Sequence, residues 1–209
     1  GYKRDVHFYI GHKPPKNSNF AKPIIDPPSY ENAMIWYNGT IARFISQDRP
    51  GSSNSLTLDW LSLDEAKFLK FQKLKEETFP ANGGFRGHFG NCPYHHGMLI
   101  ISDMPTTKAG SWFLTYKEKM DPELIDTIHG LIFERWEVKQ RMMIDPKPYH
   151  ATYLRELDIS LAKLRSVAIY YREWSSIENL MLLGESYIKQ MKRDLPPLVF
   201  QTAILCKKI

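Results

Sequence analysis

The chain has 209 residues, of which 43% are hydrophobic and 13% aromatic, so it can bury one sizeable core with a helical appendage. Its formal net charge of +5 favours an acidic partner without identifying one, and two cysteines are too few for a disulfide framework. No apolar run approaches the roughly 18 residues of a membrane-spanning helix, and no charged start leads into a signal-peptide core. These features argue against a transmembrane or disulfide-rich secreted protein, and we expect a cytoplasmic location with no membrane partner.

The first third of the chain is expected to be extended. Val6 to Ile10 form a strand-like run, and prolines between positions 14 and 28 mark loops. Two further apolar runs, within Met34 to Ser46, flank the pair Asn38-Gly39. This pair is a strong signal for a β-hairpin, because both turn positions need a positive φ.

An apolar run from Leu56 to Ala66 carries two adjacent carboxylates, Asp64 and Glu65, at its C-terminal end. A strand of this kind is typical of the Walker B element of nucleotide hydrolases. Apolar residues at helical spacing then predict a helix over residues 66–77 that ends near Pro80, and a second apolar strand runs from Gly97 toward Thr107. Strand, helix and strand in this order are typical of a parallel α/β sheet.

The second half of the chain is expected to be helical. Pro122 stands at the first position of a helix from Glu123 to about Met142, where its missing N–H costs nothing. After the boundary at residues 145–148, apolar residues recur at three- and four-residue spacing within 154–168 and again within 177–191. This pattern predicts two amphipathic helices packed as a hairpin.

In this order the segments resemble the ATPase domain of the large terminase subunit, the DNA-packaging motor of tailed bacteriophages. The sequences ISQDRPG, from Ile45 to Gly51, and SDMPTTK, from Ser102 to Lys108, look most like those of terminases of phages that infect Bacteroides-type bacteria. The resemblance covers roughly residues 2–205, with its most specific motifs between Asn38 and Trp112. It implies part of a P-loop-type parallel α/β sheet, with Walker B and coupling strands, followed by a helical hairpin subdomain.

The resemblance also implies a domain organisation. A partial ATPase domain would span residues 1–148, a helical subdomain 149–194, and a linker toward a nuclease domain 195–209. No G-x-x-x-x-G-K-[ST] motif, which would cradle the phosphates of ATP, occurs in the sequence. We therefore expect the chain to be an internal piece of a longer protein, and the 209 residues alone to hydrolyse no ATP and cleave no DNA.

Site residues follow from the same resemblance. Asp64 would hold Mg²⁺, directly or through water, and Glu65 would polarise the water that attacks the γ-phosphate of ATP. The coupling segment that senses the γ-phosphate would contain Ser102, Thr106 and Thr107. Arg49 and Arg86 are candidates for contacts with the phosphates of nucleotide or DNA, because guanidinium suits oxyanions.

The same residues have simpler explanations. Asp64 and Glu65 could cap the helix that begins at Ala66, the coupling segment could be a turn shaped by Pro105, and the arginines could lie on the surface. The residues Cys92 to His96 contain a thiol and two imidazoles, but a zinc site needs further ligands and Cys206 stands alone. Basic residues gather near both ends of the chain without interleaved aromatics, which is typical of solvated faces, and binding of a nucleic-acid backbone is the alternative for either cluster.

The partners implied by the resemblance are double-stranded DNA, the phage portal, the small terminase subunit and further copies of the chain in a ring, all in the cytoplasm of the infected host cell. Two alternatives remain open. A helicase shares an Asp-Glu pair after a strand and a Ser/Thr-rich coupling motif, but would need a second motor domain. A non-catalytic interaction module would use the acidic pair only as a helix cap, and would tolerate Glu65→Gln.

Overall fold

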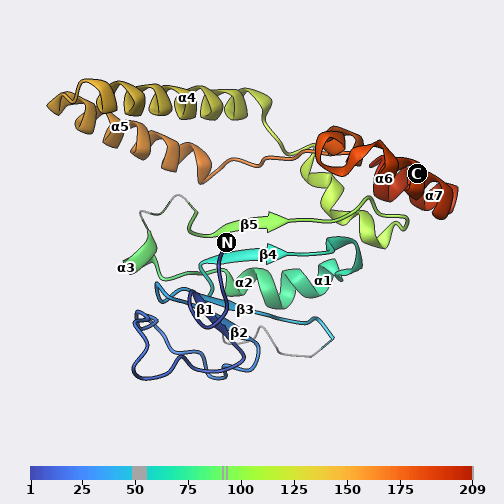
Figure 1. Ribbon diagram of the computed structural model, residues 1–209, viewed down its shortest axis with the longest axis horizontal. Coiled ribbons are helices and arrows are strands. Elements are labelled where there is room, and N and C mark those ends of the chain that lie inside the picture. Colours follow the sequence, from blue (N-terminus) through green and yellow to red (C-terminus); the bar gives the residue numbers. More distant parts are fainter. Residues whose placement is uncertain (49–55, 91, 93, 209) are drawn as a thin grey trace. The chain divides into compact units, whose positions relative to one another are not determined.

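A computed structural model describes residues 1–48, 56–90, 92 and 94–208 of the chain. The chain divides into two compact units, Gly1–Ser53 and Asn54–Ile209 (Figure 1). The described residues form a mixed α/β structure with small sheets. The domain boundaries expected at residues 148 and 194 stay a prediction.

The first unit contains a three-stranded antiparallel sheet in the order β1-β2-β3. Its strands are β1 (Phe8–Ile10), β2 (Ala33–Trp36) and β3 (Ile41–Arg43), so both the strand expected near Val6 to Ile10 and the hairpin are confirmed. In β2, Ala33 and Ile35 are fully buried while Met34 and Trp36 are half-buried. This alternation fits a strand that turns one face to the core.

The hairpin turn differs in detail from the one expected. Gly39 alone has a positive φ, of 84°, and its N–H donates to the carbonyl of Trp36 over 2.9 Å. Asn38 keeps a negative φ, and its side-chain oxygen accepts the N–H of Thr40 over 3.1 Å. The connection, residues 37–40, therefore has only its glycine in the left-handed region. The expectation of a positive φ at Asn38 was wrong, because the asparagine acts through its side chain.

The second unit contains a parallel pair, β4 (Trp60–Leu63) and β5 (Gly97–Ile100), which Figure 1 shows side by side. Trp60 lies opposite Gly97 and Leu63 opposite Ile100. Parallel strands need a crossover connection, and the helical segment between them supplies it. The parallel pairing expected from the strand, helix, strand order is confirmed.

The helix expected over residues 66–77 was wrong in its first turn. Residues Ala66–Phe68 form a separate 3₁₀ turn, η1, and Leu69 and Lys70 are extended, with ψ of 135° and 106°. The helix then runs through α1 (Phe71–Lys73), a π turn η2 (Leu74–Thr78) and α2 (Phe79–Ala81). The backbone of Ala66 is bound elsewhere: its N–H donates to Ile101 and its carbonyl accepts Nε1–H of Trp112, both over 3.1 Å. These tertiary bonds override the local helical pattern.

A buried cluster joins this helical segment to the sheet. It consists of Leu63, Ala66, Leu74, Trp112 and Phe113, and the ring of Phe71 stacks on Trp112 with centroids 4.9 Å apart. Trp112 and Phe113 come from η3 (Ala109–Tyr116), an eight-residue 3₁₀ helix that follows the β5 strand. The segments after β4 and β5 are therefore packed into one core.

The longest helix, α4 (Pro122–Ile144), confirms the helix expected from Glu123 to about Met142. The carboxylate of Asp121 accepts the N–H of Leu124 over 3.1 Å and so caps its start. Helix α5 (Pro148–Arg165) returns along α4 in Figure 1, with Ile125, Ile128 and Leu161 buried in their shared cluster.

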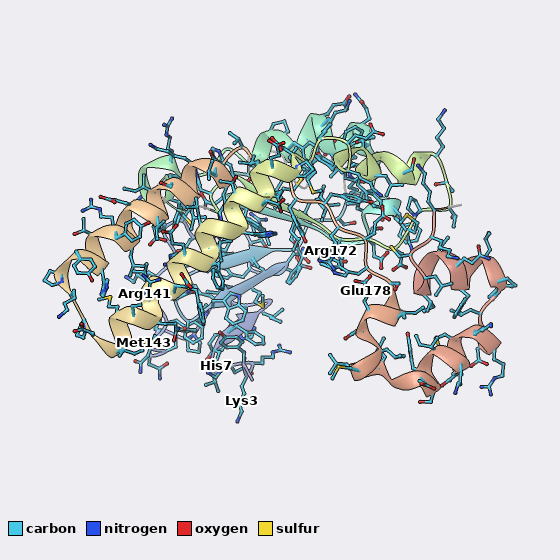
Figure 2. All side chains as sticks on the ribbon, turned by 90° about the horizontal axis from the view of Figure 1, so that it is seen from above. Lys3, His7, Arg141, Met143, Arg172 and Glu178 are labelled. Carbon is cyan, nitrogen blue, oxygen red and sulfur yellow. The ribbon has the colours of Figure 1, made fainter. Side chains whose placement is uncertain are left out.

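The expected pairing of the helices around 154–168 and 177–191 was wrong, because α5 packs against α4. Helix α6 (Leu180–Asp194) instead packs against η4 (Ser176–Asn179) and η5 (Phe200–Ile204), and Gly184, with φ of 77°, interrupts it. The three residues Asp145–Lys147 turn the chain back at once, which makes α4 the nearest partner of α5. Arg172 and Glu178, labelled in Figure 2, form an ion pair of 3.4 Å at the start of η4.

Two short helices complete the second unit, α3 (Arg86–Phe89) before β5 and α7 (Pro197–Val199) after α6. None of the helices in the described part of the chain combines the length and the apolar character needed to cross a bilayer.

Candidate functional site

The segments that follow β4 and β5 are hydrogen-bonded to each other beyond the ends of the strands. Ile101 donates its N–H to the carbonyl of Leu63 over 2.9 Å, and Ala66 donates to the carbonyl of Ile101 over 3.1 Å. Parallel strands bring their carboxyl ends to one edge of a sheet, and this edge is where open α/β sheets bind ligands. Here the edge brings the acidic pair after β4 next to the predicted coupling segment after β5.

Lys67 connects the two segments. Its N–H donates to Oγ of Ser102 over 3.1 Å, and its Nζ lies 2.9 Å from Oδ2 of Asp103 and 3.7 Å from Oε2 of Glu65. The Lys67 side chain is only 20% exposed, so these charges are partly shielded from water. Neither Lys67, two positions after Glu65, nor Asp103, inside the segment Ser102 to Lys108, was among the site residues expected from the sequence.

Asp64 and Glu65 are both exposed at the end of β4. Glu65 has φ of 50° and ψ of 47°, in the left-handed region that residues other than glycine rarely adopt, and its N–H donates to Oδ1 of Asp64 over 3.0 Å. Such a backbone conformation costs on the order of 1 kcal/mol or more and is often found at functional sites. It turns the chain sharply at the second carboxylate.

Neither carboxylate caps the turn that follows. The N–H groups of η1 have other acceptors: Ala66 donates to Ile101, Lys67 to Ser102, and Phe68 to the backbone carbonyl of Glu65. The first turn therefore has no free donor for the acidic side chains, and the helix-cap explanation of the acidic pair was wrong.

The three hydroxyl residues of the predicted coupling segment have different surroundings. Ser102 is half-buried and accepts the bond from Lys67, whereas Thr106 is exposed. The Oγ1 of Thr107 accepts the N–H of Gly110 over 3.1 Å, at the start of η3. Between them Met104 and Pro105 are buried. Of the three hydroxyls, Ser102 is the one that the structure binds to the segment carrying the acidic pair.

Arg86 belongs to the other end of the sheet. It begins α3, and the N–H of the preceding Phe85 donates to Oδ1 of Asp59 over 2.7 Å, at the residue just before β4. The structure therefore does not bring Arg86 to Asp64 and Glu65, which follow the opposite end of the same strand. Arg49, the other arginine candidate, lies outside the described residues.

Two histidines lie beside Asp59 at that amino end. Nε2 of His95 is 3.4 Å from Oδ1 of Asp59 without hydrogen-bond geometry, and a ring nitrogen of His96 lies 2.5 Å from the carbonyl oxygen of Gly83. Cys92 is exposed. Within residues 1–48, 56–90, 92 and 94–208, no three side chains of His, Cys, Asp or Glu are grouped as a metal site would need, so the zinc interpretation gains no support.

A Mg²⁺ ion held through nucleotide phosphates needs few protein ligands, because it keeps several waters and takes one or two carboxylates. Asp64 fits this role because its side chain is exposed to solvent. The N–H of Glu65 donates to Oδ1 of Asp64, which orients the carboxylate. The site thus offers one carboxylate for a hydrated cation, a second carboxylate beside it, and a serine held by the intervening lysine.

Comparisons of the chain with protein-family models, with curated proteins and with solved structures each gave no match.

Proposed function

We propose that this chain carries the Walker B and coupling strands of a large terminase subunit, the ATPase that moves double-stranded DNA into a phage procapsid. The observation that supports the proposal best is the meeting of the two segments: Asp64 and Glu65 follow β4, and Ser102 follows its parallel neighbour β5. In this proposal β4 and β5 belong to a P-loop-type sheet. Residues 1–148 are part of its ATPase domain, 149–194 a helical subdomain and 195–209 a linker.

In the proposed reaction Glu65 orients and polarises the water that attacks the γ-phosphate of ATP. The sharp turn at Glu65 places its carboxylate beyond the end of β4, where 54% of the side chain is exposed. Asp64 would hold Mg²⁺, which would supply positive charge beside the phosphates. The protein supplies position and charge, which is most of what phosphoryl transfer to water requires.

Coupling in this proposal runs through Lys67. Its backbone N–H binds Ser102 and its ammonium lies between Glu65 and Asp103, so a displacement of either segment is passed to the other. Thr106 and Thr107 continue the coupling segment toward η3. The partners are double-stranded DNA, the portal, the small terminase subunit and further copies of the chain in a ring, in the cytoplasm of an infected cell.

The test is ATP hydrolysis and DNA packaging by the full-length protein with Glu65→Gln or Asp64→Asn. Removal of a general base costs about 10²–10⁴ in rate, so Glu65→Gln should retain ATP binding and lose at least about 100-fold in hydrolysis. Glu156→Gln, an exposed carboxylate on α5, is the matched control and should leave hydrolysis unchanged. Hydrolysis that survives Glu65→Gln would refute the catalytic assignment, and ATP-driven duplex unwinding without packaging would favour a helicase.

A further inference from the structure

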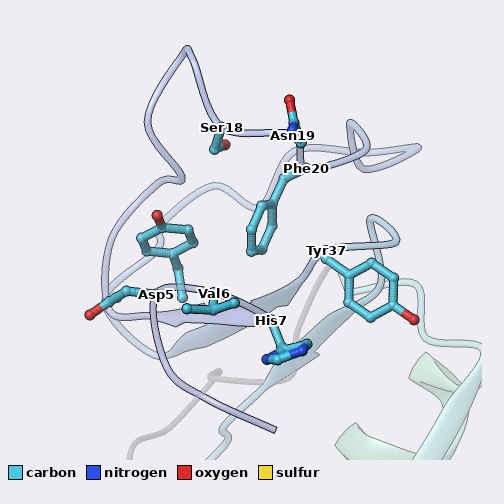
Figure 3. A pocket seen from close by; sticks show the side chains of 8 residues that line it. Asp5, Val6, His7, Ser18, Asn19, Phe20 and Tyr37 are labelled. Atoms are coloured by element: carbon cyan, nitrogen blue, oxygen red, sulfur yellow. The ribbon is translucent and has the colours of Figure 1, made fainter.

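Aromatic side chains line a pocket of about 440 Å³ in the first unit. His7, Tyr9, Phe20 and Tyr37 supply its rings, and Figure 3 shows that Phe20 and Tyr37 come from separate segments of the chain. The volume lies within the range of roughly 300–1,000 Å³ that is usual for small-ligand sites. This pocket is far in the sequence from the acidic pair, and the ATPase proposal makes no use of it.

Backbone hydrogen bonds hold the walls of the pocket in place. The N–H of Tyr37 donates to the carbonyl of His7 over 2.9 Å, and the N–H of Ala21, next to Phe20, donates to the carbonyl of Tyr37 over 2.8 Å. The rings also contact one another, with centroids 5.0 Å apart for Tyr9 and Phe20 and 6.4 Å apart for His7 and Tyr37. Three segments of the chain are thus fixed around one opening before any ligand arrives.

Polar groups lie among the rings. Nδ1 of His7 accepts the N–H of Lys3 over 3.0 Å, so the neutral imidazole carries its hydrogen on Nε2 and can donate there. Asn19 adds an exposed side-chain amide, which offers both a donor and an acceptor. A ligand that fits this set has flat apolar faces and an edge with hydrogen-bonding groups, and a nucleobase has both.

The charge of the surroundings favours an anionic ligand over a cationic one. Residues 1–48 contain six lysines and arginines against four acidic residues. The acidic member of the pocket lining, Asp5, lies 3.9 Å from Arg4, which partly neutralises it. Exposed lysines stand in the same segments as the lining residues, Lys3 before Asp5 and Lys16 before Asn19. Lysines beside stacking platforms are the usual means of holding the phosphates of a single strand.

We propose that this pocket takes one unstacked nucleobase of a single-stranded nucleic acid, which stacks on Phe20 and Tyr37 while exposed lysines bind the neighbouring phosphates. Stacking on an aromatic side chain tolerates any base, so the site selects single strands over duplexes and has little sequence preference. The sequence did not reveal it, because its rings are spread over positions 7 to 37 and meet only in the folded unit.

The test is fluorescence anisotropy of the full chain with a labelled oligothymidylate, a duplex of the same length and free AMP as competitor. The single strand should bind more tightly than the duplex, and Tyr37→Ala and Phe20→Ala should each weaken it by about 10-fold, from the usual strength of base stacking. Phe44→Ala removes an aromatic ring of the same unit that is 58% exposed and outside the pocket, and should leave binding unchanged.

Phe20 packs on Tyr9, so its truncation also tests the packing of the unit. Asn19→Ala, at an exposed position, keeps that packing and should still weaken the single strand several-fold. Unchanged binding by both Asn19→Ala and Tyr37→Ala would overturn the proposal, as would equal affinity for the duplex. If AMP displaces the labelled strand at the same concentration as an unlabelled strand does, the pocket binds free nucleotides, and the proposal of a nucleic-acid strand is wrong.

Discussion

The backbone N–H of Lys67 donates to Oγ of Ser102 over 3.1 Å, although 35 positions separate the two residues. This partly buried hydrogen bond joins the segment after β4 to the segment after β5. A buried N–H that loses its acceptor costs about 1–3 kcal/mol, so the two segments are expected to stay together in the folded protein.

Ser102→Ala should therefore lower the free energy of unfolding by about 1–2 kcal/mol, because the N–H of Lys67 loses its acceptor. Urea unfolding followed by tryptophan fluorescence measures the change. Ser111→Ala is the matched control, since the hydroxyl of Ser111 only donates to a carbonyl within an exposed turn, and its effect should stay within about 0.5 kcal/mol. Equal effects of the two substitutions would contradict the role given to Ser102.

Gly84→Ala should destabilise the chain by more than about 1 kcal/mol. The backbone φ of Gly84 is 61°, and an added Cβ would lie 2.0 Å from Nε2 of His95. Gly87→Ala has nothing within 4 Å of the added Cβ and lies within α3, so it should be neutral or stabilise by about 0.5–1 kcal/mol. If the loop before β5 packs as described, thermal unfolding should show a lower melting temperature for Gly84→Ala and an unchanged or higher one for Gly87→Ala.

Leu161→Ala should cost about 2–5 kcal/mol, because Leu161 is 2% exposed and packs against Ile125 and Ile128 of α4. Ile159→Ala, on the same helix with 49% of the side chain exposed, should cost far less. The comparison is made by chemical unfolding. If the two substitutions cost the same, α5 does not bury this face against α4.

The acid sensitivity of the second unit should depend on Glu173. Burial acts to raise the pKa of this carboxyl, but hydrogen bonds from Lys117 over 3.1 Å and from Tyr171 over 2.9 Å outweigh it and lower the pKa. Burial, followed by the bond to Glu173, raises the pKa of Tyr171, so its hydroxyl stays protonated and donates at neutral pH. A carboxyl with a lowered folded pKa stabilises the fold above its unfolded pKa of about 4.3 and loses that effect as the pH falls through the folded value.

Glu173→Gln should accordingly be less stable than the wild type at pH 7, with a difference that shrinks as the pH falls below about 4. The measurement is the free energy of unfolding of both proteins across this range. Glu185→Gln breaks an exposed pair with Lys189 and should change stability little at either pH. A difference between Glu173→Gln and wild type that stays constant with pH would contradict the described network.

Local chemistry alone predicted several elements of the fold. Asn38-Gly39 marked the hairpin, Pro122 marked the start of α4, and the strand, helix, strand order indicated the parallel pair β4 and β5. Each of these signals acts within a few residues, through turn geometry, a helix start or a periodic apolar face. The candidate site residues Asp64, Glu65 and Ser102 came from the resemblance to terminases as well as from their places just after apolar strands, and their roles stay predictions.

Tertiary structure decided what local signals leave open. The helix expected from Ala66 was replaced in its first turn by a 3₁₀ turn, because Ile101 and Trp112 hold the backbone of Ala66. Helix α5 packs against α4. An amphipathic pattern indicates that one face of a helix is buried, but it does not identify the neighbour that covers this face. Lys67 and the rings around Phe20 gained their contacts in the same way, from residues distant in sequence that the folded backbone brings within bonding distance.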